Sequence, residues 1–338
     1  MKISILGLGF MGSTHLKALL GIPNAKLTAV MSASERKLAG DLSGIRGNLG
    51  GPGELMDFSH VCKYRTVEDV LGDPDIEAVD ICLPTDQHAP VAIAALRAGK
   101  HVLVEKPMAL DGKAADEMIR EAEHCGRTLM VAQVLRFFPA YRHLAALLGE
   151  RRLGPVRYAF FRRRTAAPRW GNWQVDTKQS GGGVFDLLIH DVDMCLNLFG
   201  VPQAVSANGH EDLPRGIDCI VANLEYPGIG SVSVTGGWHH LSDYPFSMEF
   251  TVTGDLATVE FSSTGRPCTV YALGADALVL ESDEKDPYQA QLEYFIECAS
   301  NNRRPEKCPP EQSAQAVKLT RLILESRERK GERVRCDL

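Results

Sequence analysis

The sequence contains no CxxC pair, although it has nine cysteines, at positions 62, 82, 125, 195, 219, 268, 298, 308 and 336. An odd number of dispersed cysteines argues against a disulfide framework and against a structural zinc site. Their apolar surroundings, as in Ile81-Cys82-Leu83, are typical of reduced, buried thiols. We therefore expect a cytoplasmic protein.

Long apolar runs and an excess of positive charge are missing too. No apolar stretch reaches the roughly 18 residues that a membrane-spanning helix needs. Lys and Arg number 37 against 43 Asp and Glu, so the formal net charge is -6. The sequence as a whole therefore does not attract nucleic acid or anionic lipid, although a local basic patch stays open. The chain also lacks internal repeats and low-complexity tracts. A small-molecule partner is expected, with no role for nucleic acid, membrane or metal.

A length of 338 residues favours two domains. Residues 1–135 alternate apolar strands with helical segments, which predicts an α/β domain with a doubly wound parallel sheet, the Rossmann arrangement. Residues 136–338 predict an α+β domain, because strand-like alternation recurs there without helices between, which indicates a mostly antiparallel open sheet. Helices are expected at 183–199, at 289–301 and at 310–330, the last packing back on the body.

A glycine-rich turn, Gly7-Leu8-Gly9-Phe10-Met11-Gly12, lies directly between a short apolar strand and a helix-like run. In that context a GxGxxG pattern predicts a dinucleotide site, because the glycines allow a tight turn and the helix N-terminus favours the pyrophosphate charge. A turn that joins strand to helix without a ligand is the alternative. We expect Gly7, Gly9, Phe10, Met11 and Gly12 to contact the cofactor.

The end of the second strand bears on the choice of nicotinamide cofactor. An Asp or Glu there would bind the ribose 2′-hydroxyl and repel a 2′-phosphate, but this chain has Ser32. Small hydroxyls at Ser32 and Ser34, followed by Arg36 and Lys37, suit a phosphate, so NADP is favoured over NAD. Alternatively, the two cationic residues form only the solvated first turn of a helix.

Two stretches carry a family resemblance. His101-Val102-Leu103-Val104-Glu105-Lys106-Pro107 ends a strand, and with the glycine turn it resembles the glucose-fructose oxidoreductase and inositol dehydrogenase (Gfo/Idh/MocA) family, of which Glu-Lys-Pro is a signature. The stretch 181–193, a glycine run followed by Asp186, His190 and Asp193, is similar to the family's other signature. Segments 84–88 and 133–139 are similar to two further family segments, so the resemblance spans the chain.

The resemblance implies an enzyme that oxidises or reduces a hydroxyl or ketone on sugars, inositols or related polyols with NAD(P). It implies pairing of protomers through the open sheet, as a homodimer or homotetramer. Lys106, Asp186 and His190 match the family's catalytic residues, and Pro84, Thr85, His88, Glu105 and Lys106 are implied at the cofactor. Ser32 and Leu188 depart from the family's frequent acidic and polar residues at those positions.

The chemistry of these residues supports the same roles. A strand end at the carboxyl edge of a parallel sheet faces the cofactor crevice, which places Lys106 near the reacting oxygen. On a helix, Asp186, His190 and Asp193 share one face. His190 suits a general base, and Asp186 would orient the substrate or the ammonium. A zinc site on these three helix residues is a second interpretation, weakened by the lack of a further ligand.

Further candidates surround the glycine run. Trp170, Trp173 and Arg136 are proposed to bind substrate, and Trp238 and the basic run 162–164 could also wall a polar pocket. Alternatively, the tryptophans belong to a core and the arginines to a solvated strand edge. Two other functions also stay open: glycoside cleavage by transient oxidation with a tightly held nucleotide, and nucleotide sensing without catalysis.

Overall fold

The computed structural model describes residues 1–47, 53–168, 173–238, 240, 244–282 and 285–338. Its chain forms two compact units, Met1–Val134 with Lys285–Ala314, and Leu135–Glu284 with Gln315–Leu338. The first change of unit falls beside the expected position 135. Residues 285–314, expected in the second domain, belong instead to the first unit. None of the described helices is both long and apolar enough to cross a membrane.

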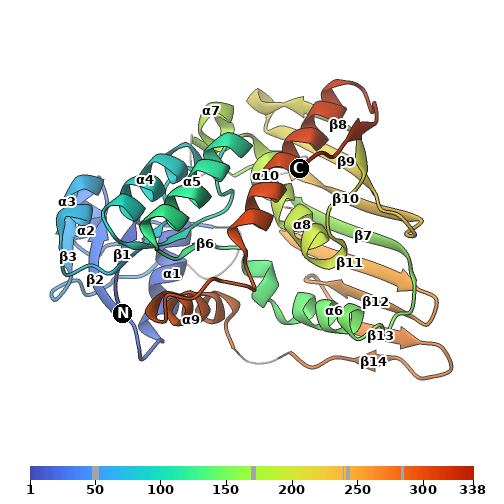
Figure 1. The fold of residues 1–338 in the computed structure, drawn as a ribbon, viewed down its shortest axis with the longest axis horizontal. Coiled ribbons are helices and arrows are strands. Elements are labelled where there is room, and N and C mark those ends of the chain that lie inside the picture. Colours follow the sequence, from blue (N-terminus) through green and yellow to red (C-terminus); the bar gives the residue numbers. More distant parts are fainter. Residues whose placement is uncertain (48–52, 169–172, 239, 241–243, 283–284) are drawn as a thin grey trace. The chain divides into compact units, whose positions relative to one another are not determined.

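The first unit is built from a parallel sheet and flanking helices (Figure 1). Its strands are β1 (Lys2–Leu6), β2 (Lys26–Met31), β3 (Cys62–Tyr64), β4 (Ala78–Ile81), β5 (His101–Val104) and β6 (Leu129–Val131). Its helices are α1 (Phe10–Leu20), α2 (Glu35–Leu38), α3 (Val67–Gly72), α4 (Thr85–Arg97), α5 (Gly112–Cys125) and α9 (Pro287–Ser300).

The strand order in the first unit is β3-β2-β1-β4-β5-β6, with every neighbouring pair parallel. All residues of β4 and β5 are buried, as their mostly apolar sequences predict, and the burial includes Asp80 and His101. From β1 the chain continues to one side of the sheet and from β4 to the other, so right-handed crossovers place α1 and α4 on opposite faces. The carboxyl ends of β1 and β4 therefore form the topological switch point, where such sheets bind nucleotides. The predicted Rossmann arrangement is confirmed.

Helix α9 explains why residues 285–314 belong to the first unit. It packs beside α1, and its Gln289 side chain donates a hydrogen bond to the Gly21 carbonyl oxygen (3.3 Å). Leu292 and Phe295 are completely buried. A long return of the chain of this kind leaves no local signal in the sequence.

The second unit consists of a large sheet with helices. Its helices are η1 (Val134–Phe137), α6 (Pro139–Gly149), η2 (Trp173–Val175), α7 (Thr177–Ser180), α8 (Gly183–Phe199), η3 (Leu213–Arg215) and most of α10 (Pro310–Glu328). Its strands are β7 (Val156–Thr165), β8 (Ala204–Asp212), β9 (Ile217–Glu225), β10 (Ser231–Trp238), β11 (Ser247–Gly254), β12 (Ala257–Ser262), β13 (Arg266–Ala272), β14 (Leu278–Val279) and β15 (Val334–Arg335).

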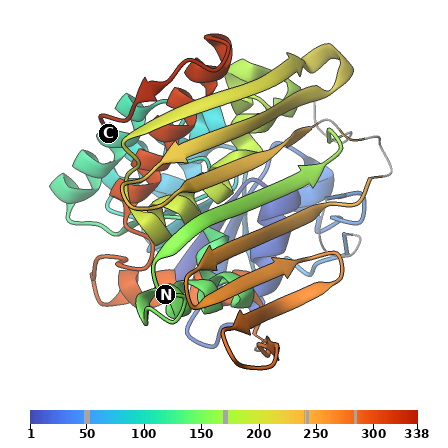
Figure 2. The same cartoon turned by 90° about the vertical axis from the view of Figure 1, so that its right-hand side faces the viewer.

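This sheet has the order β14-β13-β12-β11-β7-β10-β9-β8-β15 and is antiparallel except between β7 and β10, which confirms the predicted mostly antiparallel sheet. Helix α8 packs on β7, β9 and β10, and the Ala207 N–H of β8 donates to the Ser326 hydroxyl of α10 (2.8 Å). Figure 2 shows the strands in front of these helices. The face turned away from the helices exposes Tyr158 and Val221.

Candidate functional site

Three glycines shape the turn between β1 and α1. Gly7 has a φ of +98°, and an added Cβ would lie 2.5 Å from the Cys82 carbonyl oxygen. At Gly12 an added Cβ would lie 1.9 Å from the Gly7 carbonyl oxygen. Gly9 differs, because its φ is -86° and no described heavy atom lies within 4 Å of an added Cβ. The fold itself therefore requires glycine at positions 7 and 12 but leaves open space at position 9.

The open space at Gly9 adjoins the N-terminus of α1. The first turn of this helix carries no acidic side chain, so its backbone N–H groups offer a favourable place for an anion. A pyrophosphate can approach the backbone closely only where a glycine leaves the space of a side chain empty. Phe10 and Met11, both partly exposed, begin the helix beside it. The residues of this turn therefore fit a dinucleotide.

Two serines shape the turn after β2. The Ser32 hydroxyl accepts a hydrogen bond from the Ser34 N–H (3.2 Å), and the Ser34 hydroxyl accepts one from the Lys37 N–H (3.4 Å). Burial lowers the pKa of the Lys37 ammonium. Arg36 donates from Nε to Asp41 (2.7 Å) and is otherwise exposed. Contact of this segment with a cofactor phosphate stays a prediction.

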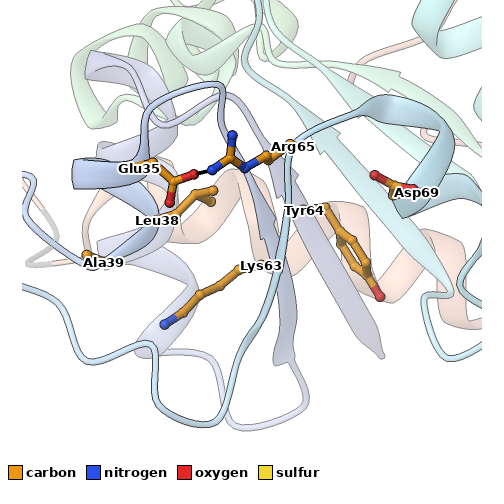
Figure 3. Close-up of a pocket in the computed structure, with 7 residues that line it drawn as sticks. All are labelled: Glu35, Leu38, Ala39, Lys63, Tyr64, Arg65 and Asp69. Atoms are coloured by element: carbon orange, nitrogen blue, oxygen red, sulfur yellow. Dashed lines mark ion pairs between the residues drawn. The ribbon is translucent and has the colours of Figure 1, made fainter.

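A cavity of about 450 Å³ lies between α2 and the end of β3 (Figure 3). Glu35 and Arg65 form an ion pair there, and Lys63 adds a second cationic side chain from the same strand end. The lining residues are Glu35, Leu38, Ala39, Lys63, Tyr64, Arg65 and Asp69. Sequence patterns do not predict this pocket, because the three residues of β3 show no periodicity; the run Lys63-Tyr64-Arg65 is a basic signal near it.

Lys106 is the second residue after β5, at the carboxyl edge of the parallel sheet. Its backbone N–H donates to the Glu105 carboxylate (3.0 Å). The following residue, Pro107, places its carbonyl oxygen 2.7 Å from His88 Nδ1, and His88 Nε2 lies 2.8 Å from the Leu83 carbonyl oxygen. The segment that carries Lys106 is thus held on both sides by buried polar side chains.

Other predicted cofactor residues lie at the start of α4, beside the end of β4. Pro84 caps this helix, Thr85 is its first residue, and His88 lies one turn further. Thr85 and His88 are buried, and both nitrogens of the His88 ring lie against backbone carbonyls. This arrangement supports a structural role for His88, and its contact with a cofactor stays a prediction.

The glycine run before α8 has its own structural reasons. Gly181 and Gly182 adopt φ angles of +82° and +97°, which favour glycine. An added Cβ at Gly183 would lie 2.4 Å from the Trp238 ring. The Val184 N–H donates to Asp218 on β9 (2.8 Å), which satisfies the N-terminus of the helix. Trp238 is therefore a core residue under the helix start, as the alternative interpretation of the tryptophans held.

Asp186 and His190 occupy a distinct position on α8. From Gly183 to Leu196, every residue of this helix is buried except these two, which are partly exposed. Their spacing of four residues places them one turn apart on the same face. An acid and an imidazole at the two partly exposed positions of this buried stretch are candidates for binding or chemistry.

The neighbouring aspartates are instead committed to buried arginines. Asp191 accepts from Arg163 Nε and Nη2, both at 2.9 Å. Asp193 accepts from Arg136 Nε at 2.8 Å and from Nη2 at 2.6 Å. With both of its oxygens on Arg136, Asp193 is not placed as a metal ligand, which removes the support for a zinc site on α8.

Arg136 was also predicted to bind substrate. Its side chain is 3% exposed and pairs with Asp193, which supports a structural role, and a substrate contact stays a prediction. Arg162 and Arg164 both pair with Glu249. Trp173 begins η2 and is partly exposed, so its role stays open, and Trp170 lies outside the described residues.

Comparison with known proteins gives two family matches. A model described as "Oxidoreductase family, NAD-binding Rossmann fold" matches residues 1–133, and one described as "Oxidoreductase family, C-terminal alpha/beta domain" matches residues 145–335. Both are the Gfo/Idh/MocA models that the sequence resemblance pointed to.

Curated relatives and solved structures agree with these matches. Inositol 2-dehydrogenase of Rhizobium meliloti is 32% identical over 61% of this chain and 58% of its own length. Trans-1,2-dihydrobenzene-1,2-diol dehydrogenase of Macaca fuscata fuscata is 35% identical over 49% of this chain and 50% of its own. The chain thus spans only about half of the length of these relatives. Levoglucosan dehydrogenase in complex with NADH has the same fold, with a TM-score of 0.84 at 19% identity over 99% of both chains.

Proposed function

Because the chain belongs to the Gfo/Idh/MocA oxidoreductase family, we propose that it transfers a hydride between a nicotinamide cofactor and a carbon that carries a hydroxyl or ketone group. The proposal rests on the open space beside Gly9. The fold does not require glycine there, whereas a dinucleotide at the N-terminus of α1 does. The proposed substrates are sugars, inositols or related polyols. The named relatives are dehydrogenases of an inositol and of a cyclic diol, which supports this class.

Three side chains supply the chemistry that the protein itself contributes. The bound nicotinamide would exchange a hydride with the substrate carbon. In the oxidation direction, His190 accepts the hydroxyl proton and passes it to solvent. The Lys106 ammonium stabilises the negative charge that develops on the substrate oxygen, and Asp186, one turn before His190, orients the substrate hydroxyl. In the reduction direction the proton moves the other way.

We extend the proposal to a preference for NADP. Ser32 leaves the end of β2 without the carboxylate that would repel a 2′-phosphate, and Ser34, Arg36 and Lys37 follow in the adjoining turn. Lys63 adds a cationic side chain at the end of the neighbouring strand β3, whereas the charge of Arg65 is paired with Glu35. NAD remains the alternative cofactor.

Location and assembly belong to the same proposal. All nine cysteines are free thiols, which suits a reducing compartment and hence the cytoplasm. The helix-free face of the second unit's sheet exposes apolar side chains, which suits pairing of protomers into a homodimer or homotetramer. Light scattering of the purified protein measures the assembly, and a monomer at all concentrations would contradict it.

The test of the dinucleotide site is Gly9→Ala. The backbone at Gly9 accepts alanine without strain and the added methyl group meets no described atom, so the variant should fold as the wild type does. The methyl group would occupy the space of the pyrophosphate, which costs about 1–3 kcal/mol and weakens dinucleotide binding about fivefold or more. Gly72→Ala is the matched control, because its added Cβ also meets no described atom.

Calorimetric titration of NADP and NAD measures the effect. Equal affinities of Gly9→Ala and Gly72→Ala for both cofactors would place the nucleotide elsewhere. A panel of sugars, inositols and sugar acids, assayed by absorbance of reduced nicotinamide, then identifies the substrate. Turnover without net cofactor reduction would instead indicate redox-assisted glycoside cleavage, and tight nucleotide binding without any turnover would indicate a sensor.

A further inference from the structure

A buried cluster of charged side chains lies beneath the glycine turn of the first unit. His15 comes from α1, Asp80 and Cys82 from β4 and its end, and Glu105 from the end of β5. The side chains of His15, Asp80 and Glu105 are 0%, 1% and 7% exposed. None of these residues is explained by the proposed chemistry, although the last is covalently joined to Lys106.

His15 connects two carboxylates. Its Nδ1 lies 2.8 Å from Asp80 Oδ2, and its Nε2 lies 3.2 Å from Glu105 Oε1. The second contact lacks the direction of a good hydrogen bond, so it acts mainly through charge. Both ring nitrogens thus face oxygens that carry no proton when ionised, which favours the doubly protonated, cationic ring.

The surrounding charges act in the same direction. Burial by itself lowers the pKa of His15, but the charge of Asp80 and its hydrogen bond to the ring contribute to raising it well above its ordinary value. Burial raises the pKa of Glu105, yet its contacts with His15 and the charge of Lys106 lower it overall. From α9, the Tyr288 ring packs beside His15, with its centroid 6.2 Å away.

The Glu105 carboxylate links this cluster to Lys106. While Oε1 faces His15, Oε2 accepts the backbone N–H of Lys106 (3.0 Å). On the other side of the lysine, the Pro107 carbonyl is held by His88. Hence a chain of contacts runs from α1, which begins at the glycine turn, to the backbone of the proposed catalytic lysine.

We propose that His15 is a positioning residue for Lys106: as a buried cation between Asp80 and Glu105, it fixes the carboxylate that holds the lysine's backbone. The inference rests on the proposed function, in which Lys106 acts on the substrate oxygen. It assigns the cluster a role in turnover, whereas a cluster that served stability alone would leave the position of Lys106 unchanged.

A metal ion is the competing interpretation, because His15, Asp80 and Cys82 offer donor atoms within 4.8 Å of one another. The 2.8 Å separation of Nδ1 and Oδ2 is a direct hydrogen-bond distance, with no atom between. Burial, followed by the charge of Asp80, raises the pKa of the Cys82 thiol, which keeps it protonated rather than a thiolate ligand. The cluster is thus satisfied without a metal.

Turnover and pH dependence test the inference in the full-length protein. In His15→Gln, kcat should fall about ten- to a hundredfold, because a displaced Lys106 is poorly aligned. The Kd for NADP should change less than about threefold, since the glycine turn itself is kept. His60→Gln, at an exposed histidine of the same unit, is the control and should match the wild type. An unchanged kcat in His15→Gln would overturn the inference.

A second variant covers the case that His15→Gln does not fold. Asp80→Asn keeps an oxygen acceptor for Nδ1 but removes one counter-charge of His15. The alkaline limb of the kcat profile should then move down by about one to three pH units. An unmoved limb would contradict the role of the cation, because loss of packing alone does not shift a titration.

Two measurements on the wild type do not depend on activity. Nitrogen NMR of labelled histidine should show the His15 ring doubly protonated at pH 7, and a neutral ring would overturn the inference. Zinc in stoichiometric amounts in the purified protein would do the same. If no substrate of the panel is turned over, the proposed function fails, while the NMR result still decides the charge of His15.

Discussion

The Arg163–Asp191 pair allows a prediction whose size follows from the structure. The two side chains are 2% and 0% exposed and form two hydrogen bonds, and Asp191 directly follows His190 in sequence. Besides Asp191, Arg163 interacts with the Tyr141 hydroxyl and makes a weak contact from Nη1 to the Met248 sulfur at 3.7 Å. Burial raises the pKa of Tyr141, so neither of these groups supplies a counter-charge. Asp191→Ala therefore leaves a buried guanidinium without its counter-charge, which costs about 3–5 kcal/mol.

The double variant Arg163→Met with Asp191→Leu should recover most of that loss, because it removes both charges and keeps apolar volume. A matched control exists at the other end of the same strand. Arg157 and Asp255 also form a two-bond pair, but their side chains are 57% and 41% exposed, so Asp255→Ala should have little effect on stability.

Urea unfolding followed by tryptophan fluorescence measures these effects. All three tryptophans, at positions 170, 173 and 238, belong to the second unit, so the signal reports on the unit that holds both pairs. Turnover of Asp191→Ala should fall as well, since the pair holds α8 in its orientation. If Asp191→Ala destabilises the protein no more than Asp255→Ala does, the reasoning on buried charge is wrong.

Four further outcomes are expected. Lys106→Met should lower kcat by about a hundredfold or more with nearly unchanged dinucleotide affinity in titrations, and unchanged turnover would exclude its proposed role. His190→Asn should remove the acidic limb of the oxidation pH profile, and persistence of that limb would point to another base. Ser32→Asp should weaken NADP binding by about 1 kcal/mol or more relative to NAD binding. Equal catalytic efficiency of the wild type with NAD and NADP would contradict the proposed preference. Because the pKa of His15 is raised on folding from an ordinary 6.5, its stabilising contribution is complete below that pH and is lost as pH rises through the raised value. The unfolding free energy of the wild type should therefore fall toward that of His15→Gln in alkaline solution, as circular dichroism would show.

Local patterns in the sequence predicted much of the fold. Strands β4 and β5 were visible as apolar runs, and α8 begins and ends at the expected residues 183 and 199. The short strand β3 and the helix α6 were not predicted, because a three-residue strand shows no periodicity and the chain around Pro139 gives mixed signals.

The sequence by itself determined the family, the two sheets and the candidate residues, because glycine turns, apolar strands and helical spacing are local properties of the chain. Helical spacing placed Asp193 on one face with Asp186 and His190, but no sequence pattern gave a role to Asp191 or Asp193. Only the tertiary structure decided that the latter two are buried against Arg163 and Arg136, and that residues 285–314 return to the first unit. Burial and pairing depend on side chains brought together from distant parts of the chain, so no local pattern contains them.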